Sequence, residues 1–339
     1  MIERKDVSDK FVLGVDIGGT KVAAGLVNGA GQVVSRTRVP MHASGTAIQA
    51  MDCVHEAIAK AMAGSAPGDI TAIGVSSPGP LDPHSGVVLH SPNLPCWVEF
   101  PLRREIEERY GLPVRLDNDA NAAGLAEATW GAGAGHNSVF YVTIGTGVGT
   151  AIILDGSVLY GRTGTAAEGG HMTIDFRAPI RCGCGKHGCL ESMASGPAMA
   201  LRAREMVAGD GASGATMLAL SDGEVDRITA EVVVDAARSR DPLAQKVLRD
   251  TVDLLTIWLG NIVDLLEPDV IVIGGGVGAR IPEWFEGIRE KLPNWSINTR
   301  ANEIPILPAK YGTDAGIAGS AALWLCEEKK TTAAPELQL

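Results

Sequence analysis

The stretch GVDIGGTK, residues 14–21, contains the residues on which the fold prediction depends. The run that ends at Ile17 is apolar and β-branched except for Asp16, so it predicts a buried strand that carries one carboxylate. Gly18 and Gly19 end this strand, and a second apolar run follows directly. Two adjacent glycines permit a sharp turn and let another group approach their backbone N–H donors. The pattern is therefore strand, glycine turn, strand.

Two interpretations of this turn stay open. Asp16, with the Thr20 hydroxyl nearby, would suit a hydrated Mg²⁺ held near phosphate oxygens. Alternatively, the stretch is a tight hairpin in which Asp16 only satisfies nearby backbone donors, since Gly-Gly hairpins are common. The stretch is not a Walker loop, because that motif needs a four-residue gap before Gly-Lys and a following helix.

Length and composition indicate an ordinary globular enzyme. The 339 residues favour two domains, with 45% hydrophobic and 20% charged residues. The net charge of −11 argues against nucleic-acid binding and against docking on anionic membranes. The first ten residues lack the apolar core of a signal peptide, and acidic residues interrupt the longest apolar region, 252–273. We therefore expect a cytoplasmic protein whose six cysteines are thiols or metal ligands.

The order of expected elements alternates between strand and helix, which predicts an α/β fold. A second strand–glycine–strand unit at 139–154 has the same order of elements as the first, as expected of a duplicated fold. We predict a small α/β domain over residues 1–120 and a larger one over 121–310. The C-terminal helix, about 311–327, is expected to pack back on the small domain. The expected strands are 14–17, 22–27, 32–39, 70–76, 114–116, 139–144, 151–154 and 270–273, and the expected helices are 47–62, 102–110, most of 198–258, and the C-terminal one.

A cluster of cysteines is the strongest local signal. His171, Cys182, Cys184 and Cys189 offer one imidazole and three thiolates, the set that Zn²⁺ takes in closed structural sites. A disulfide is the alternative, but the expected compartment opposes it and three cysteines leave one unpaired. We interpret the cluster as a structural zinc site.

Two glutamates flank this cluster. Glu168 lies three residues before His171, and Glu191 lies two residues after Cys189. A metal that fixes both ends of the loop would hold the two carboxylates in place, and carboxylates accept hydrogen bonds from sugar hydroxyls. The alternative, that both glutamates are simply solvated, stays open.

Polar side chains also gather at 117–121, read as DNDAN, between an expected strand and an Ala-rich helix. One of them would suffice as a helix N-cap, which is the alternative interpretation. Ligands bind at the carboxyl ends of strands in α/β folds, so an aspartate here could accept a proton from an attacking hydroxyl. Its neighbour Asn118 could orient the same substrate.

The glycines at 274–278 follow an expected strand and resemble a dinucleotide fingerprint only weakly. No acidic residue closes a second strand at the required distance, so NAD is rejected. The better functional interpretation is that these glycines form a flat backbone surface against which a nucleotide base or ribose packs.

Taken together, these motifs resemble the ROK family of the actin-like ATPase superfamily. The resemblance follows the chain in order over roughly residues 11–325, and Pro179 stands where the family usually has glycine. The motifs that carry it are GVDIGGTK (14–21), LDNDANAAGLAE (116–127), TIGTGVGTAI (143–152), EGGH (168–171) and CGCGKHGCLE (182–191).

The resemblance implies a two-domain actin-like ATPase (ribonuclease H-like) fold with a structural zinc loop. The family contains sugar kinases and transcriptional repressors, and the repressors carry an additional N-terminal winged helix. Only ten residues precede Phe11, so we expect a kinase that uses ATP and Mg²⁺. A homodimer or homotetramer is expected.

The family's site residues carry over by motif position. Asp119 would be the general base, and His171 would contact both zinc and sugar. The implied sugar-binding residues are Gly79, Asn93, Asn118, Asp119, Glu168, His171 and Glu191. The implied nucleotide-binding residues are Asp16, Gly18, Gly19, Thr20, Lys21, Gly145, Thr146, Gly147, Gly149, Gly275 and Gly276.

Different stretches of the chain resemble kinases of different sugars. The stretches at 78–83 and 91–95 with Trp97 resemble bacterial glucokinases, whereas 85–91 also looks like N-acetylmannosamine kinases. Phosphorylation of glucose at the 6-hydroxyl is the prediction, with N-acetylmannosamine or another hexose as the alternative. A sugar-sensing regulator without catalysis is a third interpretation, which the retained Asp119 opposes. Relatives that use polyphosphate generally lack the cysteine cluster, so ATP is the expected donor.

Overall fold

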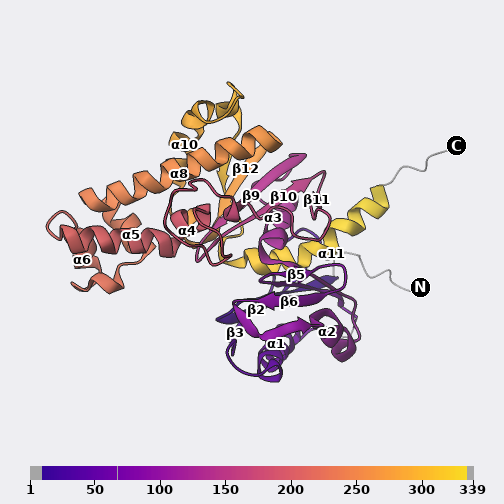
Figure 1. Cartoon of the computed structure of the whole chain (residues 1–339). Coiled ribbons are helices and arrows are strands. Elements are labelled where there is room, and N and C mark those ends of the chain that lie inside the picture. The colour runs from indigo at the N-terminus through magenta and orange to yellow at the C-terminus, as the bar shows by residue number, and fades with distance from the viewer. Residues whose placement is uncertain (1–9, 67, 334–339) are drawn as a thin grey trace. The chain divides into compact units, whose positions relative to one another are not determined.

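The computed structural model describes residues 10–66 and 68–333, and the chain forms two compact units (Figure 1). Unit 1 contains the chain up to Gly135, Ile152–Ala166 and the chain from Tyr311 on. Unit 2 contains His136–Ala151 and Ala167–Lys310. Residues 1–9, most of the stretch in which the sequence shows no signal-peptide pattern, lie outside the described residues.

Unit 1 is built on a five-stranded sheet with the order β3-β2-β1-β4-β8. Strand β1 pairs antiparallel with β2 and parallel with β4, and β4 pairs parallel with β8. A second sheet, β5-β6-β7, follows β4 in the chain. The elements of unit 1 are β1 Phe11–Ile17, β2 Lys21–Asn28, β3 Thr37–Pro40, α1 Ala47–Met62, β4 Ile70–Ser77, β5 Leu81–Asp82, β6 Val87–Ser91, β7 Leu94–Phe100, α2 Leu102–Tyr110, β8 Val114–Asn118, α3 Asp119–Trp130, β11 Ser157–Val158, the 3-10 turn Gly312–Asp314 and α11 Ala315–Ala333.

Both faces of β1 are covered, which explains why its sequence is continuously apolar rather than alternating. On one face Leu13 and Val15 join a core that includes the buried residues of α1. On the other face Val12 packs in a separate core with Ile317 and Ala321 of α11. The strand therefore separates two hydrophobic cores within unit 1.

The backbone of helix α11 packs directly against the backbone of the sheet, with no side chain between them at two glycines. A methyl group on Gly14 of β1 would lie 2.0 Å from the Ile317 carbonyl oxygen, and one on Gly74 of β4 would lie 1.8 Å from that of Ser320. Gly14 and Gly74 are partners in the parallel ladder, so together they form one flat site for the helix. The Ser320 hydroxyl also donates to the Val15 carbonyl at 2.9 Å. This approach is possible because α11 and the sheet are both built from small residues here.

Unit 2 carries β9, β12, β13 and the first part of β10, which belong to a further sheet ordered β11-β10-β9-β12-β13. It also carries most of the helices. Strand β12 pairs parallel with both β9 and β13. The longest helix, α8, buries Trp258 and Leu259 and begins at the N-cap Asp241, whose side chain accepts from the Ala244 amide. The elements are β9 Ser138–Ile144, β10 Val148–Leu154 (in unit 2 up to Ala151), α4 Leu190–Ala194, α5 Gly196–Gly209, α6 Ala215–Leu220, α7 Ala230–Arg238, α8 Pro242–Leu266, β12 Val270–Gly274, α9 Gly275–Gly278, α10 Phe285–Lys291, β13 Ile306–Pro308, and 3-10 turns at Gly169–His171, Val225–Arg227, Pro282–Trp284, Leu292–Asn294 and Ala301–Glu303.

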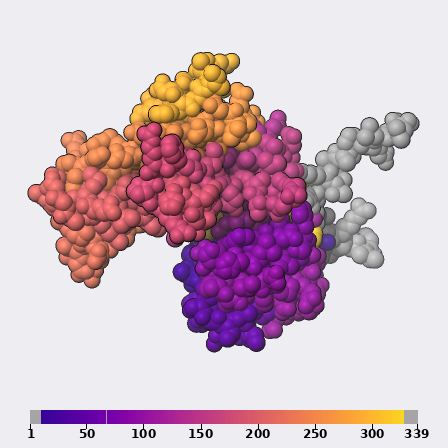
Figure 2. Space-filling model, viewed as in Figure 1, coloured from indigo at the N-terminus to yellow at the C-terminus, as the bar shows by residue number. Residues whose placement is uncertain are grey.

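The residues between β11 and α4 form a long segment with only one short 3-10 turn, and this segment reaches the surface of unit 2 (Figure 2). It contains the cysteine cluster. Within residues 10–66 and 68–333, no helix combines the length and the hydropathy needed to cross a membrane.

The expected elements are present, but several differ in their bounds and some strands were not predicted. The stretch expected to be helical at 198–258 is divided into α5, α6, α7 and α8, and α8 continues to Leu266. Strands β5, β6, β7 and β13 are among those that were not predicted.

The prediction of a strand at 32–39 is wrong over its first half, since only Thr37–Pro40 pairs as a strand. Before it, the Ser35 hydroxyl accepts a hydrogen bond from the Leu26 amide, and Val33 makes one isolated bridge to β2. The strand expected at 114–116 continues to Asn118, since Asp117 and Asn118 still pair with β4. The C-terminal helix begins at Ala315 rather than 311, after a 3-10 turn.

The close approach of α11 predicts a large cost for one added methyl group. Gly74→Ala should lower the free energy of unfolding by about 2–3 kcal/mol or more, because the methyl group would overlap the α11 backbone. Gly29→Ala is the matched control, since nothing lies within 4 Å of its added carbon. The measurement is the midpoint of the earliest urea transition. Equal midpoints for the two variants would contradict this packing.

Candidate functional site

The glycine turn of unit 1 is a closed hairpin that leaves Asp16 facing a second strand. The Gly18 amide donates to the Lys21 carbonyl at 2.9 Å, which closes the turn. Asp16 Oδ1 accepts from the Ser76 hydroxyl of β4 at 3.0 Å. Burial raises the pKa of Asp16, while the Ser76 hydrogen bond and the charge of Lys21 act in the opposite direction. The hairpin is thus real, but the hydrogen bond of this carboxylate comes from a neighbouring strand and not from the turn.

Gly316, in the first turn of α11, is a residue of this site that the sequence reasoning missed. A methyl group on Gly316 would lie 2.2 Å from Asp16 Oδ2. The start of α11 therefore contacts the carboxylate directly, and only glycine leaves room for it. The signal in the sequence was the stretch Ala315–Ala322, in which every residue except Ile317 is small; it predicts close packing but not against which strand.

The structure brings two pairs of predicted site residues together within unit 1. A methyl group on Gly19 would lie 2.8 Å from the Asn93 carbonyl oxygen, so the glycine turn lies against the loop between β6 and β7. A methyl group on Gly79 would lie 3.3 Å from Asn118 Nδ2. Thr20, beside this turn, is exposed.

The junction of β8 and α3 combines a cap with an exposed carboxylate. Asn118 is the N-cap of α3, and its Oδ1 accepts from the Ala120 amide at 2.8 Å, so the capping interpretation is correct for this residue. Asp119 is the first residue of the helix and is exposed. The geometry therefore presents Asp119 to solvent with its backbone fixed.

Asp117 is buried beneath this junction and holds it together. Its Oδ1 accepts from the Asn118 amide at 2.6 Å and from Asn121 Nδ2 at 3.0 Å. Its Oδ2 accepts from the Tyr160 hydroxyl at 2.7 Å. Burial raises the pKa of Asp117, and the hydrogen bonds from Tyr160 and Asn121 oppose that rise. Tyr160 was missed by the sequence reasoning, because nothing in the sequence relates it to a strand more than forty residues earlier.

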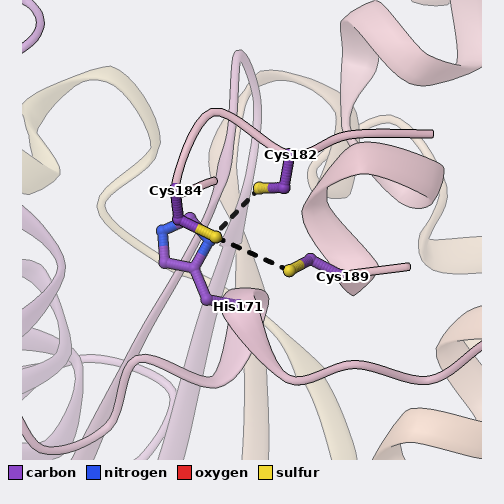
Figure 3. A group of neighbouring side chains, drawn as sticks. All are labelled: His171, Cys182, Cys184 and Cys189. Atoms are coloured by element: carbon purple, nitrogen blue, oxygen red, sulfur yellow. Dashed lines mark hydrogen bonds between the residues drawn. The ribbon is translucent and has the colours of Figure 1, made fainter. Parts of the chain in front are cut away.

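In unit 2, the four predicted zinc ligands point toward one another (Figure 3). Their ligand atoms all lie within 4.8 Å of one another. Cys184 Sγ lies 3.6 Å from Cys189 Sγ, and Cys182 Sγ lies 3.5 Å from His171 Nδ1. Zinc–sulfur bonds of about 2.3 Å at tetrahedral angles place two sulfur atoms about 3.8 Å apart, close to the spacing found here. The cluster can hold a zinc ion.

Glu191 ties this cluster to the second glycine turn. Its Oε2 accepts from the Val148 amide at 3.1 Å, and a methyl group on Gly147 would lie 2.5 Å from the same oxygen. Its Oε1 lies 3.8 Å from His171 Nδ1 and 3.6 Å from Cys182 Sγ. Glu191 is therefore held in place rather than solvated. Glu168 is exposed, and its carbonyl accepts from the His171 amide at 3.1 Å.

A cavity of about 480 Å³ opens beside the second glycine turn, and its lining includes Gly145, Thr146 and Gly276, three of the residues predicted to bind nucleotide. Gly275 supports the wall: it has φ +85°, and a methyl group there would lie 2.4 Å from the Ile144 carbonyl oxygen. Gly147 contacts Glu191, and Gly149 lies in β10, so neither lines this cavity. The other lining residues, which the sequence reasoning missed, are Gly196, Pro197, Ala200, Arg204, Thr229, Ala230, Glu231 and Val277.

Comparison with known proteins supports the predicted resemblance. A glucokinase from Halalkalibacterium halodurans is 33% identical over 328 residues, covering 96% of this chain and 98% of that protein. A glucokinase from Streptomyces coelicolor is 34% identical over 315 residues, covering 92% and 97%. A crystal structure of a ROK family glucokinase from Streptomyces griseus, in complex with glucose and AMPPNP, matches with a TM-score of 0.81 and 36% identity over 92% of this chain and 98% of that one.

These matches confirm the predicted α/β fold of actin-like ATPase type. The ROK family model matches residues 12–327, which includes both glycine turns, the DNDAN stretch and the cysteine cluster. With relatives of this identity over almost its whole length, the chain belongs to the ROK family.

Proposed function

We propose that this protein is an ATP-dependent glucokinase that phosphorylates the 6-hydroxyl of glucose. The observation that carries the proposal is the exposed Asp119 at the start of α3, directly after the capped Asn118. Its Oδ1 accepts from the Ala120 amide at 2.8 Å, and because the side chain is exposed a substrate hydroxyl can approach it. The relatives named glucokinase and the S. griseus complex with glucose and AMPPNP support the choice of substrates.

The family resemblance assigns the sugar contacts to Gly79, Asn93, Asn118, Glu168, His171 and Glu191. Amide and carboxylate groups can read sugar hydroxyls through directed hydrogen bonds. Because His171 Nδ1 faces Cys182, its other ring nitrogen, Nε2, would be the one that contacts sugar.

The nucleotide would use the glycine turns and the cavity of unit 2. Its volume of about 480 Å³ lies in the range of small-molecule sites and suits an adenosine group. Glu231 lines this cavity and could accept hydrogen bonds from ribose hydroxyls. The turns at 16–21 and 145–149 would meet the phosphates with backbone N–H donors. Asp16 would hold Mg²⁺, which when bound neutralises charge on the phosphoryl oxygens.

Asp119 would act as the general base. The glucose 6-oxygen attacks the γ-phosphorus, the bond from that phosphorus to the bridging oxygen breaks, and ADP leaves. The hydroxyl proton passes to Asp119. A free aspartate has a pKa of about 3.9 and is a weak base, but phosphoryl transfer has a loose transition state that depends mostly on positioning. Asp119 would therefore orient the oxygen first and take the proton late.

We also propose that the cluster in unit 2 binds zinc and that the role of this ion is structural. Four protein ligands would fill a tetrahedral shell, so no open position would be left for a reacting water molecule. Burial raises the pKa of the Cys182 thiol to about 12, so a bound ion would have to displace this proton. The zinc would fix Glu191 and His171 at the sugar. A cytoplasmic location and a homodimer or homotetramer stay predictions.

A panel of hexoses, with ADP release measured by a coupled assay, tests the function. We expect glucose to give the highest kcat/KM. Higher kcat/KM for N-acetylmannosamine would change the substrate but not the reaction. Sugar binding without ADP release from any hexose would identify a sensing protein and overturn the kinase proposal.

Asp119→Asn keeps the shape of the side chain but cannot accept the proton. A positioned base contributes roughly 10²–10⁴-fold, so kcat should fall by about that factor. The KM for glucose should change far less, because the other sugar-binding residues remain. Asp52→Asn, on the exposed side of α1, is the control and should leave both constants unchanged. If Asp119→Asn kept near-normal kcat, another residue would be the base.

Glu191→Ala should show the opposite kinetic signature. It removes a proposed sugar contact and the acceptor of the Val148 amide, so KM for glucose should rise more than kcat falls. Glu205→Ala, on α5 of the same unit, is the control. A fall in kcat with unchanged KM would count against a role in ground-state sugar binding.

Cys184→Ser should lower the zinc content of the purified protein, measured by elemental analysis, from about one ion per chain. It should weaken glucose binding as well, since the metal would hold Glu191 and His171. Cys96→Ser changes a cysteine of unit 1 and should retain full zinc. Full occupancy in Cys184→Ser would reject the ligand assignment.

A further inference from the structure

One buried threonine of unit 2 holds the backbone on both sides of Glu168. Thr150 lies in β10, and its hydroxyl donates to the Ala167 carbonyl. The same oxygen accepts from the Gly169 amide at 2.8 Å. Thr150 is buried, whereas Glu168 is exposed. The hydroxyl therefore joins the residue before Glu168 to the residue after it, while the carboxylate itself stays accessible to solvent.

The turn that this hydroxyl holds has an unfavourable backbone conformation. Ala167 has φ +62°, in the left-handed region that favours glycine. At Gly169, a methyl group would lie 2.9 Å from Thr150 Oγ1, so the turn packs on the threonine with no side chain between them. An unfavourable conformation persists only where surrounding contacts hold it, and Thr150 supplies such a contact.

Further contacts in unit 2 hold the chain that follows Glu168. The indole N–H of Trp258, a fully buried residue of α8, donates to the Gly169 carbonyl at 3.0 Å. A methyl group on Gly170 would lie 1.9 Å from a carbonyl oxygen of β10, so the backbone of the turn packs on the backbone of that strand. These contacts lie after Glu168, and the contact of Thr150 also reaches the residue before it.

We propose that Thr150 is a positioning residue for sugar binding and acts through Glu168. Strand β10 would then place both glutamates that are proposed to contact the sugar. It holds Glu191 through the Val148 amide, and it holds the backbone of Glu168 through a hydroxyl two positions further along. A carboxylate whose backbone is already ordered loses less conformational entropy when it binds a ligand. This inference rests on the proposed function, because the contact between Glu168 and sugar is part of it.

Thr150→Val tests the hydroxyl, because valine keeps the shape of threonine but loses both hydrogen bonds. The KM for glucose should rise about three- to tenfold, the range that one net hydrogen bond corresponds to, and kcat should change by about twofold or less. Thr150→Ser keeps the hydroxyl and should keep the original KM. Thr150→Ala also removes the hydroxyl and adds no bulk, so it replaces Thr150→Val if valine impairs folding. Thr256→Val is the matched control, since this threonine is also buried in unit 2 but donates to the Val252 carbonyl within α8.

A double-mutant cycle separates positioning from a general loss of stability. Glu168→Ala removes the carboxylate through which Thr150 is proposed to act. In that background Thr150→Val should raise the KM by about twofold or less, because no positioned group is left to lose. The same increase in both backgrounds would overturn the proposal, and so would a KM in Thr150→Ser as high as in Thr150→Val. Loss of zinc from Thr150→Val would place the effect at the metal ligands and would also overturn it.

Amide hydrogen exchange of the full chain, measured by NMR, tests the held backbone without any activity. The Gly169 amide should exchange about tenfold faster in Thr150→Val, because its acceptor is lost, and at the original rate in Thr150→Ser. Equal rates in the unaltered protein and both variants would overturn the positioning role. If exchange changes as expected but no hexose is phosphorylated, the proposed function and its sugar contact are refuted, whereas the hold of Thr150 on the turn stands.

Discussion

The contact between α11 and the glycines of β1 and β4 is the constraint on which unit 1 depends. Gly14 and Gly74 lie side by side in the ladder, and α11 lies so close to them that its carbonyl oxygens fill the space of their missing side chains. Because the helix is fixed in this way, its first turn brings Gly316 against Asp16. The last element of the chain therefore determines the surroundings of a carboxylate near its beginning.

In unit 2, side-chain contacts rather than backbone packing hold the segment that carries the candidate site. The segment that carries the cysteines has little regular structure, so strand pairing cannot hold it. The four-residue cluster draws its two ends together, and Glu191 extends from it to the Val148 amide. One carboxylate thus joins the candidate metal site to a glycine turn. This arrangement explains why the glutamate is partly buried although it lies beside a polar, exposed loop.

The DNDAN stretch shows how neighbouring residues of one chemical type divide their roles. Asp117 is buried and accepts three hydrogen bonds, from Asn118, Asn121 and Tyr160. Asn118 caps the helix, while Asp119 is exposed. Asp117 and Asp119, which are two positions apart, therefore differ in solvent exposure and in their roles. The buried one stabilises the junction, and the exposed one is the candidate base.

The amino-acid sequence was enough to predict the α/β class, the helix Ala47–Met62, both glycine turns, the four candidate metal ligands and the family. These follow from short-range patterns, since hydrophobic periodicity and motif spacing depend on residues near one another in the chain. Three contacts became visible only in the folded chain: Glu191 accepts from the Val148 amide, Gly316 lies against Asp16, and Tyr160 donates to Asp117. Each joins residues 43 or more positions apart, or opposite ends of the chain, and no local pattern encodes such a pair.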